Sequence, residues 1–227
     1  SEVIYGLVKD YLNIKTPYYS NTAFASQIYS SNEFGEDGLV DGIPVWCFIF
    51  YCLRAGSVDA AISVVQKLTH APALQNELRN ILREYKLSND GYLSRKTEEQ
   101  LKLNYQRTIR LSNDAFKKSV YSIFARCAHD QFYAEIFDKV DDFLWIKLKK
   151  VSFAEPERES TNISTLGISL PDQFNLSQFK QEVIEELGES YFDAQDQPFL
   201  YFRALFLTLQ WEAAVEFLFR FDAYRCY

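Results

Sequence analysis

Two segments that lie far apart along the chain share one pattern, and this pattern restricts the fold more than any other feature. Pro44 begins the apolar run PVWCFIFYCL, which leads into Ala60-Ala61, and Pro198 begins the run PFLYFRALFL, which leads into Ala213-Ala214. In each copy the first part is apolar nearly all round, whereas the second part has one polar face. The pattern predicts an inner helix packed between neighbours and an outer helix that half faces water, with the alanines allowing close approach.

Each copy is therefore expected to be an antiparallel helical hairpin. The first runs from Pro44 to about Ala55 and from Val58 to Leu68, with Asp41 or Gly42 as the cap and Gly56 at the turn. The second runs from Phe199 to about Leu209 and from Trp211 onward. The proline and the first alanine are 16 positions apart in one copy and 15 in the other, which predicts turns that differ by one residue. Aromatic residues of the inner helices, such as Phe48 and Phe206, are expected to be buried.

Apolar residues at helical spacing predict further helices over residues 3–12, 74–85, 97–109, 116–127, 136–151 and 179–187. Thr97 with Gln100 is a candidate capping box, Asn113 or Asp114 a candidate cap, and Glu98 is placed to pair with Lys102. A cap is also expected near Ser177, with Gly188 ending that helix. The polar segments 13–40 and 154–175 are predicted to be flexible loops.

The chain holds only 8 glycines and 6 prolines and shows no sustained strand alternation, so folds with many tight turns and α/β sheets are disfavoured. The fold class that remains is all-α: an irregular α-solenoid of stacked antiparallel helical hairpins. Two copies are too few for a regular repeat. Because the chain opens at Ser1 and contains no methionine, we expect residues 1–227 to form a single, incomplete segment of a longer solenoid.

Composition also narrows the classes of partner. The net charge is −7 and the pI about 5.0, so the overall charge of the chain does not attract nucleic acid or anionic lipid. The longest apolar run, from Ile43 to Leu53, is too short for a membrane span, which needs about 20 residues. The four cysteines have no metal-binding spacing and are expected to be reduced core residues.

Residues that could carry chemistry are few. The only histidines are His70 and His129, and no nucleotide-binding or hydrolase motif occurs. Asp138, Asp141 and Asp142 share a helix face that could hold Mg²⁺ for a diphosphate, but a second acidic motif is missing. Lys139, Lys147, Lys149 and Lys150 instead suggest a mixed-charge, solvated face. The sequence therefore predicts no catalytic, metal or cofactor site, and a protein that is not an enzyme.

Aromatic residues near the end of the chain outnumber what one buried stripe needs. We expect them to form a packing or partner surface on which another hairpin lies. The residues are Phe217, Phe219, Phe221, Tyr224 and Tyr227.

The segment 197–220, QPFLYFRALFLTLQWEAAVEFLFR, resembles the most recognisable stretch of the nucleoporin-interacting-component family, the large inner-ring scaffold nucleoporins of the nuclear pore complex. Other segments resemble the family in the same order along the chain. They are residues 42–46, 51–54, 97–105, 119–121, 126–127, 142–148, 176–179 and 188–190.

The resemblance implies an α-solenoid related to the ancestral coatomer element, without catalytic activity. It implies a structural role at the nuclear envelope that supports protein and mRNA transport and pore assembly. The implied partners are other inner-ring and channel nucleoporins, with no direct nucleic-acid contact and membrane proximity only through partners. The family's N-terminal coiled coil and far C-terminal helices have no counterpart in these residues, so no partner-binding residue can be carried over. A vesicle-coat or adaptor α-solenoid, built from the same hairpins, is the alternative.

Overall fold

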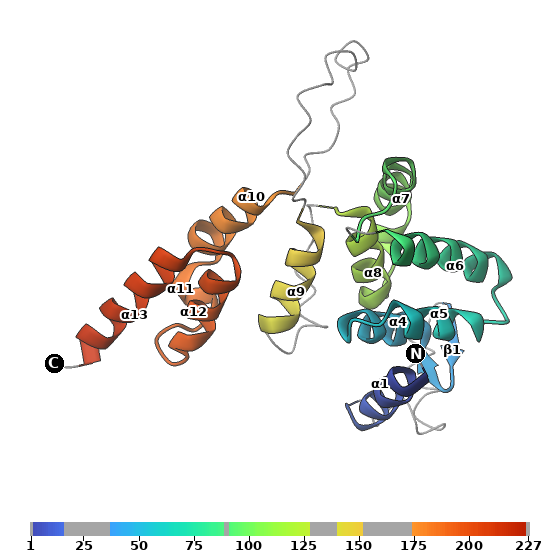
Figure 1. The fold of residues 1–227 in the computed structure, drawn as a ribbon, viewed down its shortest axis with the longest axis horizontal. Coiled ribbons are helices and arrows are strands. Elements are labelled where there is room, and N and C mark those ends of the chain that lie inside the picture. The colour runs from blue at the N-terminus through green and yellow to red at the C-terminus, as the bar shows by residue number, and fades with distance from the viewer. Residues whose placement is uncertain (1, 16–36, 89–90, 128–139, 152–173, 226–227) are drawn as a thin grey trace, which may run out of the picture. The chain divides into compact units, whose positions relative to one another are not determined.

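The computed structural model describes residues 2–15, 37–88, 91–127, 140–151 and 174–225, and these are mostly helical (Figure 1). The chain divides into two compact units, which we describe separately. Unit 1 comprises Ser1–Ala125 and Gln131–Ile136, and unit 2 comprises Arg126–Asp130 and Phe137–Tyr227. That the two form a single solenoid segment stays a prediction. The expected loops at 13–40 and 154–175 lie largely outside the described residues.

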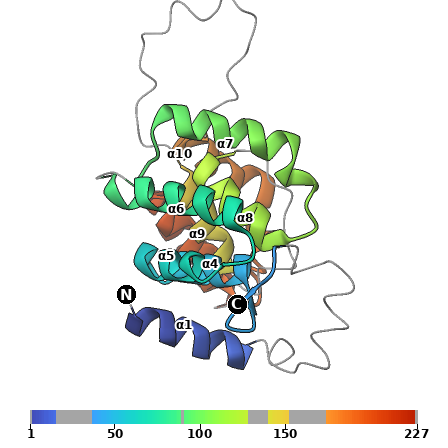
Figure 2. The ribbon, with the colours of Figure 1, turned by 90° about the vertical axis from the view of Figure 1, so that its right-hand side faces the viewer.

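Unit 1 is a stack of helices. Helix α1 (Glu2–Lys15) packs across α4 (Val45–Arg54) and α5 (Val58–Gln66), and Figure 2 shows it lying along their lower side. Helix α6 (Pro72–Leu87) packs on α5, and α8 (Ala115–Ala125) packs on α4 and on α7 (Arg95–Arg107). A 3₁₀ turn, η1 (Ile109–Leu111), connects α7 to α8. The helical architecture predicted from the apolar spacing is confirmed.

The core of unit 1 is centred on α4, in which every residue from Val45 to Leu53 is buried. Rings pack in contact across helices: Phe50 lies 5.4 Å from Phe116, measured between centroids, and Trp46 lies 5.3 Å from Tyr121. Cys47 and Cys52 belong to this core as free thiols. Burial raises the pKa of the Cys52 thiol to about 12, so both act as small apolar residues.

A short antiparallel ribbon precedes α4 and was not expected from the sequence. Strand β1 (Leu39–Val40) pairs with β2 (Ile43–Pro44). Asp41 and Gly42, with φ of 52° and 83°, form the two-residue turn, a backbone shape that Asp-Gly favours. The predicted cap at Asp41 or Gly42 is therefore wrong: α4 begins after Pro44, and the Val45 amide donates to the carbonyl of Gly38 at 3.1 Å.

Helix starts elsewhere in unit 1 agree with the sequence in part. Asp114 caps α8, since its Oδ1 accepts from the Lys117 amide at 3.0 Å, and Glu98 pairs with Lys102 at 2.6 Å, both as predicted. The Thr97 capping box is wrong. Ser94 is the cap of α7, and the Thr97 hydroxyl instead donates to Glu84 of α6 at 2.9 Å. A tertiary partner thus competes with the local cap.

Unit 2 contains α9 (Val140–Lys150), α10 (Leu176–Gln181), the π-helical segment η3 (Glu182–Leu187), α11 (Gly188–Tyr191), α12 (Pro198–Leu207) and α13 (Trp211–Arg225). Asn175, rather than Ser177, caps α10 in a complete capping box with Gln178. Gly188, with φ of 62°, ends η3 as predicted, although one further helical turn follows it.

The core of unit 2 is also aromatic. Tyr201 of α12 stacks edge-on against Phe217 of α13 with centroids 5.0 Å apart, and lies 5.6 Å from Phe192. Phe179 and Val183 are fully buried beside them. The pairing of α12 with α13 confirms the second predicted hairpin.

The two hairpins, α4–α5 and α12–α13, have the same turn. Three residues join the helices in each, 55–57 and 208–210. The Ser57 amide donates to Cys52 O at 3.0 Å, and the Gln210 amide donates to Leu205 O at 2.9 Å. The prediction that the turns differ by one residue is therefore wrong. The difference in spacing arises at the start of the hairpins, because α12 begins at Pro198 whereas α4 begins one residue after Pro44. Residues of the two hairpins correspond with an offset of 153.

Candidate interaction surface

Large apolar side chains of α12 and α13 are exposed to solvent in unit 2. On α13, Trp211 is 58% exposed, Val215 50% and Phe219 75%. Their spacing of four residues places them along one face of the helix. On α12, Phe199 and Phe206 are also more than half exposed. We call Trp211, Val215 and Phe219 the α13 stripe.

Of the residues predicted from the sequence to form a packing or partner surface, Phe217 and Phe219 fall on different sides of α13. Phe217 is buried in the core against Tyr201, and Phe221 is half-buried, 6.0 Å from Phe217. Phe219 faces solvent. The side chain of Tyr224 and all of Tyr227 lie outside the described residues. The sequence reasoning passed over Trp211 and Val215, which the spacing i, i+4, i+8 ending at Phe219 would have identified.

Two carboxylates flank the α13 stripe. Glu212 and Glu216 are exposed and form no ion pair with any described residue. Arg220 differs, because its guanidinium donates to Glu189. The face therefore combines apolar area with unpaired negative charge, which suits a partner that is apolar and basic.

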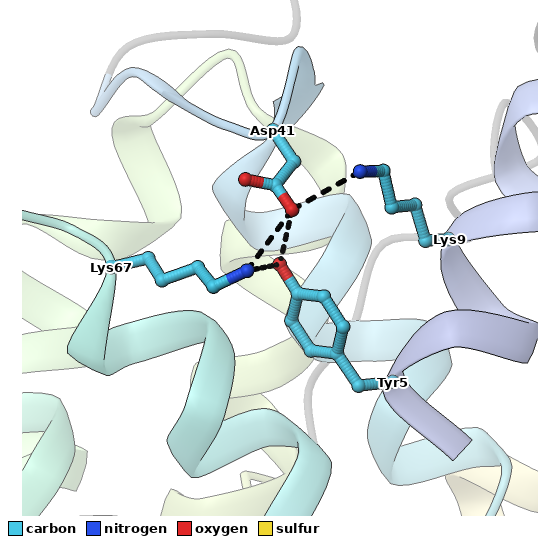
Figure 3. Close-up of polar contacts among 4 residues, drawn as sticks. All are labelled: Tyr5, Lys9, Asp41 and Lys67. Atoms are coloured by element: carbon cyan, nitrogen blue, oxygen red, sulfur yellow. Dashed lines mark hydrogen bonds and ion pairs between the residues drawn. The ribbon is translucent and has the colours of Figure 1, made fainter. Parts of the chain in front are cut away.

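A polar cluster in unit 1 fastens α1 to the rest of the unit (Figure 3). Asp41 Oδ2 accepts from the Tyr5 hydroxyl at 2.8 Å, from Lys67 at 3.1 Å and from Lys9 at 3.2 Å. The hydrogen bond from Tyr5, joined by those from the two lysines, lowers the pKa of Asp41 to about 2. The cluster therefore stays ionised at neutral pH and links α1, the ribbon turn and the end of α5.

A second polar group surrounds Asp37, just before the ribbon. Its carboxylate accepts from the Trp46 indole at 2.7 Å and pairs with Lys117 at 2.8 Å. The His70 ring lies 2.9 Å from the Asp37 carbonyl, so its Nε2 donates there, and the ring occupies the space beside Gly38. This hydrogen bond gives His70 a structural role in unit 1. His129 lies outside the described residues.

The lysines of α9 differ from the expectation of a solvated face. Lys147 is buried and pairs with Glu182 at 2.7 Å, with its ammonium 5.3 Å from the Phe174 ring centroid. Lys150 is also buried, and desolvation lowers its pKa to about 7. The prediction of solvated charge is therefore wrong for both residues, because their long side chains reach into the core of unit 2.

The acidic cluster of α9 does not resemble a metal site. Both carboxylate oxygens of Asp141 accept from Nη1 of Arg203, at 2.6 and 2.8 Å, and Asp138 lies outside the described residues. Within the described ranges, no three His, Cys, Asp or Glu side chains gather as metal ligands would. In the same ranges, no helix has the length and apolar character of a membrane span.

The fold and the surface together define a helical-stack protein whose exposed features suit packing against other helices. Comparison with known proteins identifies the family. The model of the Nup93/Nic96 family matches residues 3–227, and the chain belongs to that family.

Relatives of known name agree with this assignment. The nuclear pore complex protein Nup93 of Xenopus laevis is 38% identical over 98% of this chain, and that of Danio rerio 40% identical over 97%. Each alignment covers 24% of the relative, so the chain spans about a quarter of the length of these relatives. Among solved structures, the crystal structure of Chaetomium thermophilum Nic96 SOL matches 97% of this chain and 34% of its own, with a TM-score of 0.64 and 20% identity. This likeness confirms the all-α solenoid fold.

Proposed function

We propose that this chain is a structural part of the nuclear pore complex scaffold, in the inner ring, and that it supports nucleocytoplasmic transport and pore assembly. The observation that carries the proposal is the family match over residues 3–227, together with relatives named as nuclear pore complex proteins. Its partners are other inner-ring and channel nucleoporins, and it reaches the nuclear membrane through them. It neither binds nucleic acid directly nor catalyses a reaction.

The physical basis of this function is rigid packing. Helices of unit 1 bury a continuous aromatic core around α4, and polar clusters at Asp37 and Asp41 join segments far apart in sequence. Unit 2 adds a partly buried ion pair between Lys147 and Glu182. Such interactions hold helices in fixed positions, which a load-carrying scaffold requires. The vesicle-coat or adaptor alternative uses similar hairpins but has no support from the comparisons.

Localisation of the full-length protein tests the proposal. A fluorescent tag at the endogenous gene is expected to give punctate signal at the nuclear rim, whereas Golgi or endosomal signal would favour the coat alternative. Depletion followed by rescue then tests the role of this segment. Full-length protein lacking residues 189–227 is expected to fail in pore assembly, and the matched control Glu99→Ala, which removes only an exposed ion pair with Arg95, is expected to rescue. Rescue by the deleted form would contradict the proposal.

A further inference from the structure

The two units differ in charge, although both are built from helices. Unit 1 contains 14 acidic and 14 basic residues, whereas unit 2 contains 17 acidic and 10 basic ones, so the whole net charge of −7 belongs to unit 2. Within unit 1 the cations are concentrated in α7 and η1, which together contain five basic residues and two acidic ones. This asymmetry suits unit 1 and unit 2 to partners of opposite charge.

The two acidic residues of α7 are already paired within their own helix. Glu98 pairs with Lys102 at 2.6 Å, and Glu99 pairs with Arg95 at 3.0 Å. Each pair joins residues four positions apart, so neither needs a partner from outside the helix. Three cations of α7 and η1 therefore remain without an acidic neighbour on these elements.

These three cations, Lys96, Arg107 and Arg110, are exposed, and none of them forms an ion pair with another residue that the structure describes. Lys96, Leu103 and Arg107 are seven and four positions apart, so they lie along one face of α7. Leu103 is 51% exposed, and Leu111 of η1 is 72% exposed. Helix α7 lies at the end of unit 1 opposite α1 (Figure 1 and Figure 2). We call these five residues the basic face.

The helical run of α10 and η3 in unit 2 presents the reverse combination. Ile184 is 43% exposed, and the adjacent Glu185 and Glu186 are exposed as well. Neither carboxylate pairs with a cation among the described residues, and Glu185 accepts from the neutral Gln181 side chain at 2.8 Å. An apolar side chain beside two unpaired carboxylates complements an apolar side chain between two unpaired cations. We call Ile184, Glu185 and Glu186 the η3 face.

We propose that the basic face of one copy of the protein binds the η3 face of a second copy, with Leu103 against Ile184 and the cations against the two carboxylates. The second copy is inferred as the occupant because the chain itself supplies the complementary charges. The two faces differ, so they join copies head to tail, and contacts of this kind close into a ring where the rotation between copies allows it. The inference rests on the proposed function, a place in a ring-shaped scaffold.

Sedimentation velocity of the full-length protein tests the contact through its charges. Wild-type protein is expected to self-associate, with an association constant that falls as salt rises from about 50 to about 300 mM, because salt screens exposed charges. Lys96→Glu with Arg107→Glu is expected to weaken self-association by at least about tenfold, and so is Glu185→Lys with Glu186→Lys. Arg83→Glu reverses an exposed cation of α6 and is the matched control, with an expected change below about twofold.

Mixing the two charge-reversed variants separates a contact between copies from any other effect of the substitutions. An equimolar mixture is expected to associate again, because the unchanged basic face of one variant meets the unchanged η3 face of the other. A monomeric wild type, an equal loss in the Arg83→Glu control, or a mixture that associates no more than the separate variants would each overturn the proposal.

Photo-crosslinking tests which surfaces meet. A p-benzoylphenylalanine placed at Leu103 of the full-length protein, in a mixture of isotope-labelled and unlabelled copies, is expected to crosslink to the peptide that contains Ile184 of the other copy. The same probe at the exposed Gln66 of α5 is expected to give no such crosslink. A crosslink from Leu103 within one copy, to a different protein, or to nothing would contradict the proposal. Signal of the unsubstituted protein at the nuclear rim is scored separately, so failure of this contact and failure of the scaffold function remain distinguishable.

Discussion

The hairpins α4–α5 and α12–α13 have the same turn and a fully buried alanine at the same position of the second helix, which we call the seam position, but they differ in their surroundings. Ala61 and Ala214 are fully buried at corresponding seam positions, and the αL residues Gly56 and Leu209 correspond at the turns. Outside the seam the similarity ends. Trp46 of α4 is fully buried, whereas its counterpart Phe199 of α12 is 68% exposed. A hairpin's internal geometry is thus encoded locally, but the burial of its outer residues depends on which neighbours are present.

The neighbours explain the difference. Helix α4 lies against α1, α5 and α8, and these neighbours bury its residues from Val45 to Leu53. Helix α12 packs on α13 and η3 and forms an ion pair with α9 through Arg203, but Phe199, Phe206 and Leu207 remain exposed in unit 2. The expectation that Phe206 is buried like Phe48 is therefore wrong for the described residues.

Substitution of these two aromatic residues should give the largest contrast. Phe48→Ala is expected to lower the free energy of unfolding by about 3 to 5 kcal/mol, because it removes a fully buried ring that contacts Tyr5 and leaves a cavity. Phe206→Ala, at a half-exposed ring, should cost less than about 1 kcal/mol. Urea unfolding followed by far-ultraviolet dichroism measures both. Equal losses at the two sites would show that α12 is as enclosed as α4.

The shared seam should respond equally in both hairpins. Ala61→Leu and Ala214→Leu each place a large side chain between helices that are already in contact, so each is expected to cost about 1 to 3 kcal/mol. The exposed position Gln66, changed to Leu, is the matched control and should have little effect. A tolerated leucine at only one of the two alanines would show that the seams are packed differently.

Sequence periodicity predicted the helices of both units well. Apolar residues three and four positions apart, such as Leu78, Ile81 and Leu82, indicate one buried face of a helix and do not fit a strand. It missed features that depend on tertiary partners. The Asp41-Gly42 turn was taken for a cap because both roles suit these residues, and Thr97 bonds to Glu84 rather than to its own helix. Lys147 was assigned to solvent because its carboxylate partner, Glu182, is 35 residues away.

The candidate surface was predicted only as a region. Aromatic content placed it on the last helix, but Phe217 and Phe219 could not be assigned to inner and outer faces without the position of α12. Trp211 was predicted to belong to the last helix but was not included in the surface, because the aromatic residues chosen for it all lie farther along that helix. Composition therefore indicated the helix, and packing was needed to show which of its aromatic residues are exposed.

The Asp41 cluster has no counterpart in the second hairpin and should make the stability of unit 1 depend on pH. Asp41→Asn keeps the turn, since Asn-Gly also favours it, and removes the charge, with an expected cost of about 1 to 2 kcal/mol at pH 7. The folded pKa of about 2 lies below the ordinary 3.8, so the stabilisation is complete above about pH 5 and is lost as the pH falls toward 2.

The measurement is the difference in urea midpoint between the wild type and Asp41→Asn across this pH range, followed by far-ultraviolet dichroism. The difference should narrow steadily below pH 4. A difference that stays constant down to pH 2 would mean that the carboxylate contributes through shape rather than through its charge.

The smallest expected effects lie at the two turns, where the same backbone shape is occupied by different residues. Gly56 has φ of 75° and Leu209 φ of 59°, and a side chain at Gly56 would meet no other atom within 4 Å. Gly56→Ala should therefore cost about 1 kcal/mol from backbone strain alone. Leu209→Gly relieves the same strain but adds freedom to the unfolded chain, so its net effect should stay below about 0.5 kcal/mol. Thermal unfolding of both variants tests this asymmetry, and a large stabilisation by Leu209→Gly would mean that the second turn is held under strain by the packing of α12 against α13.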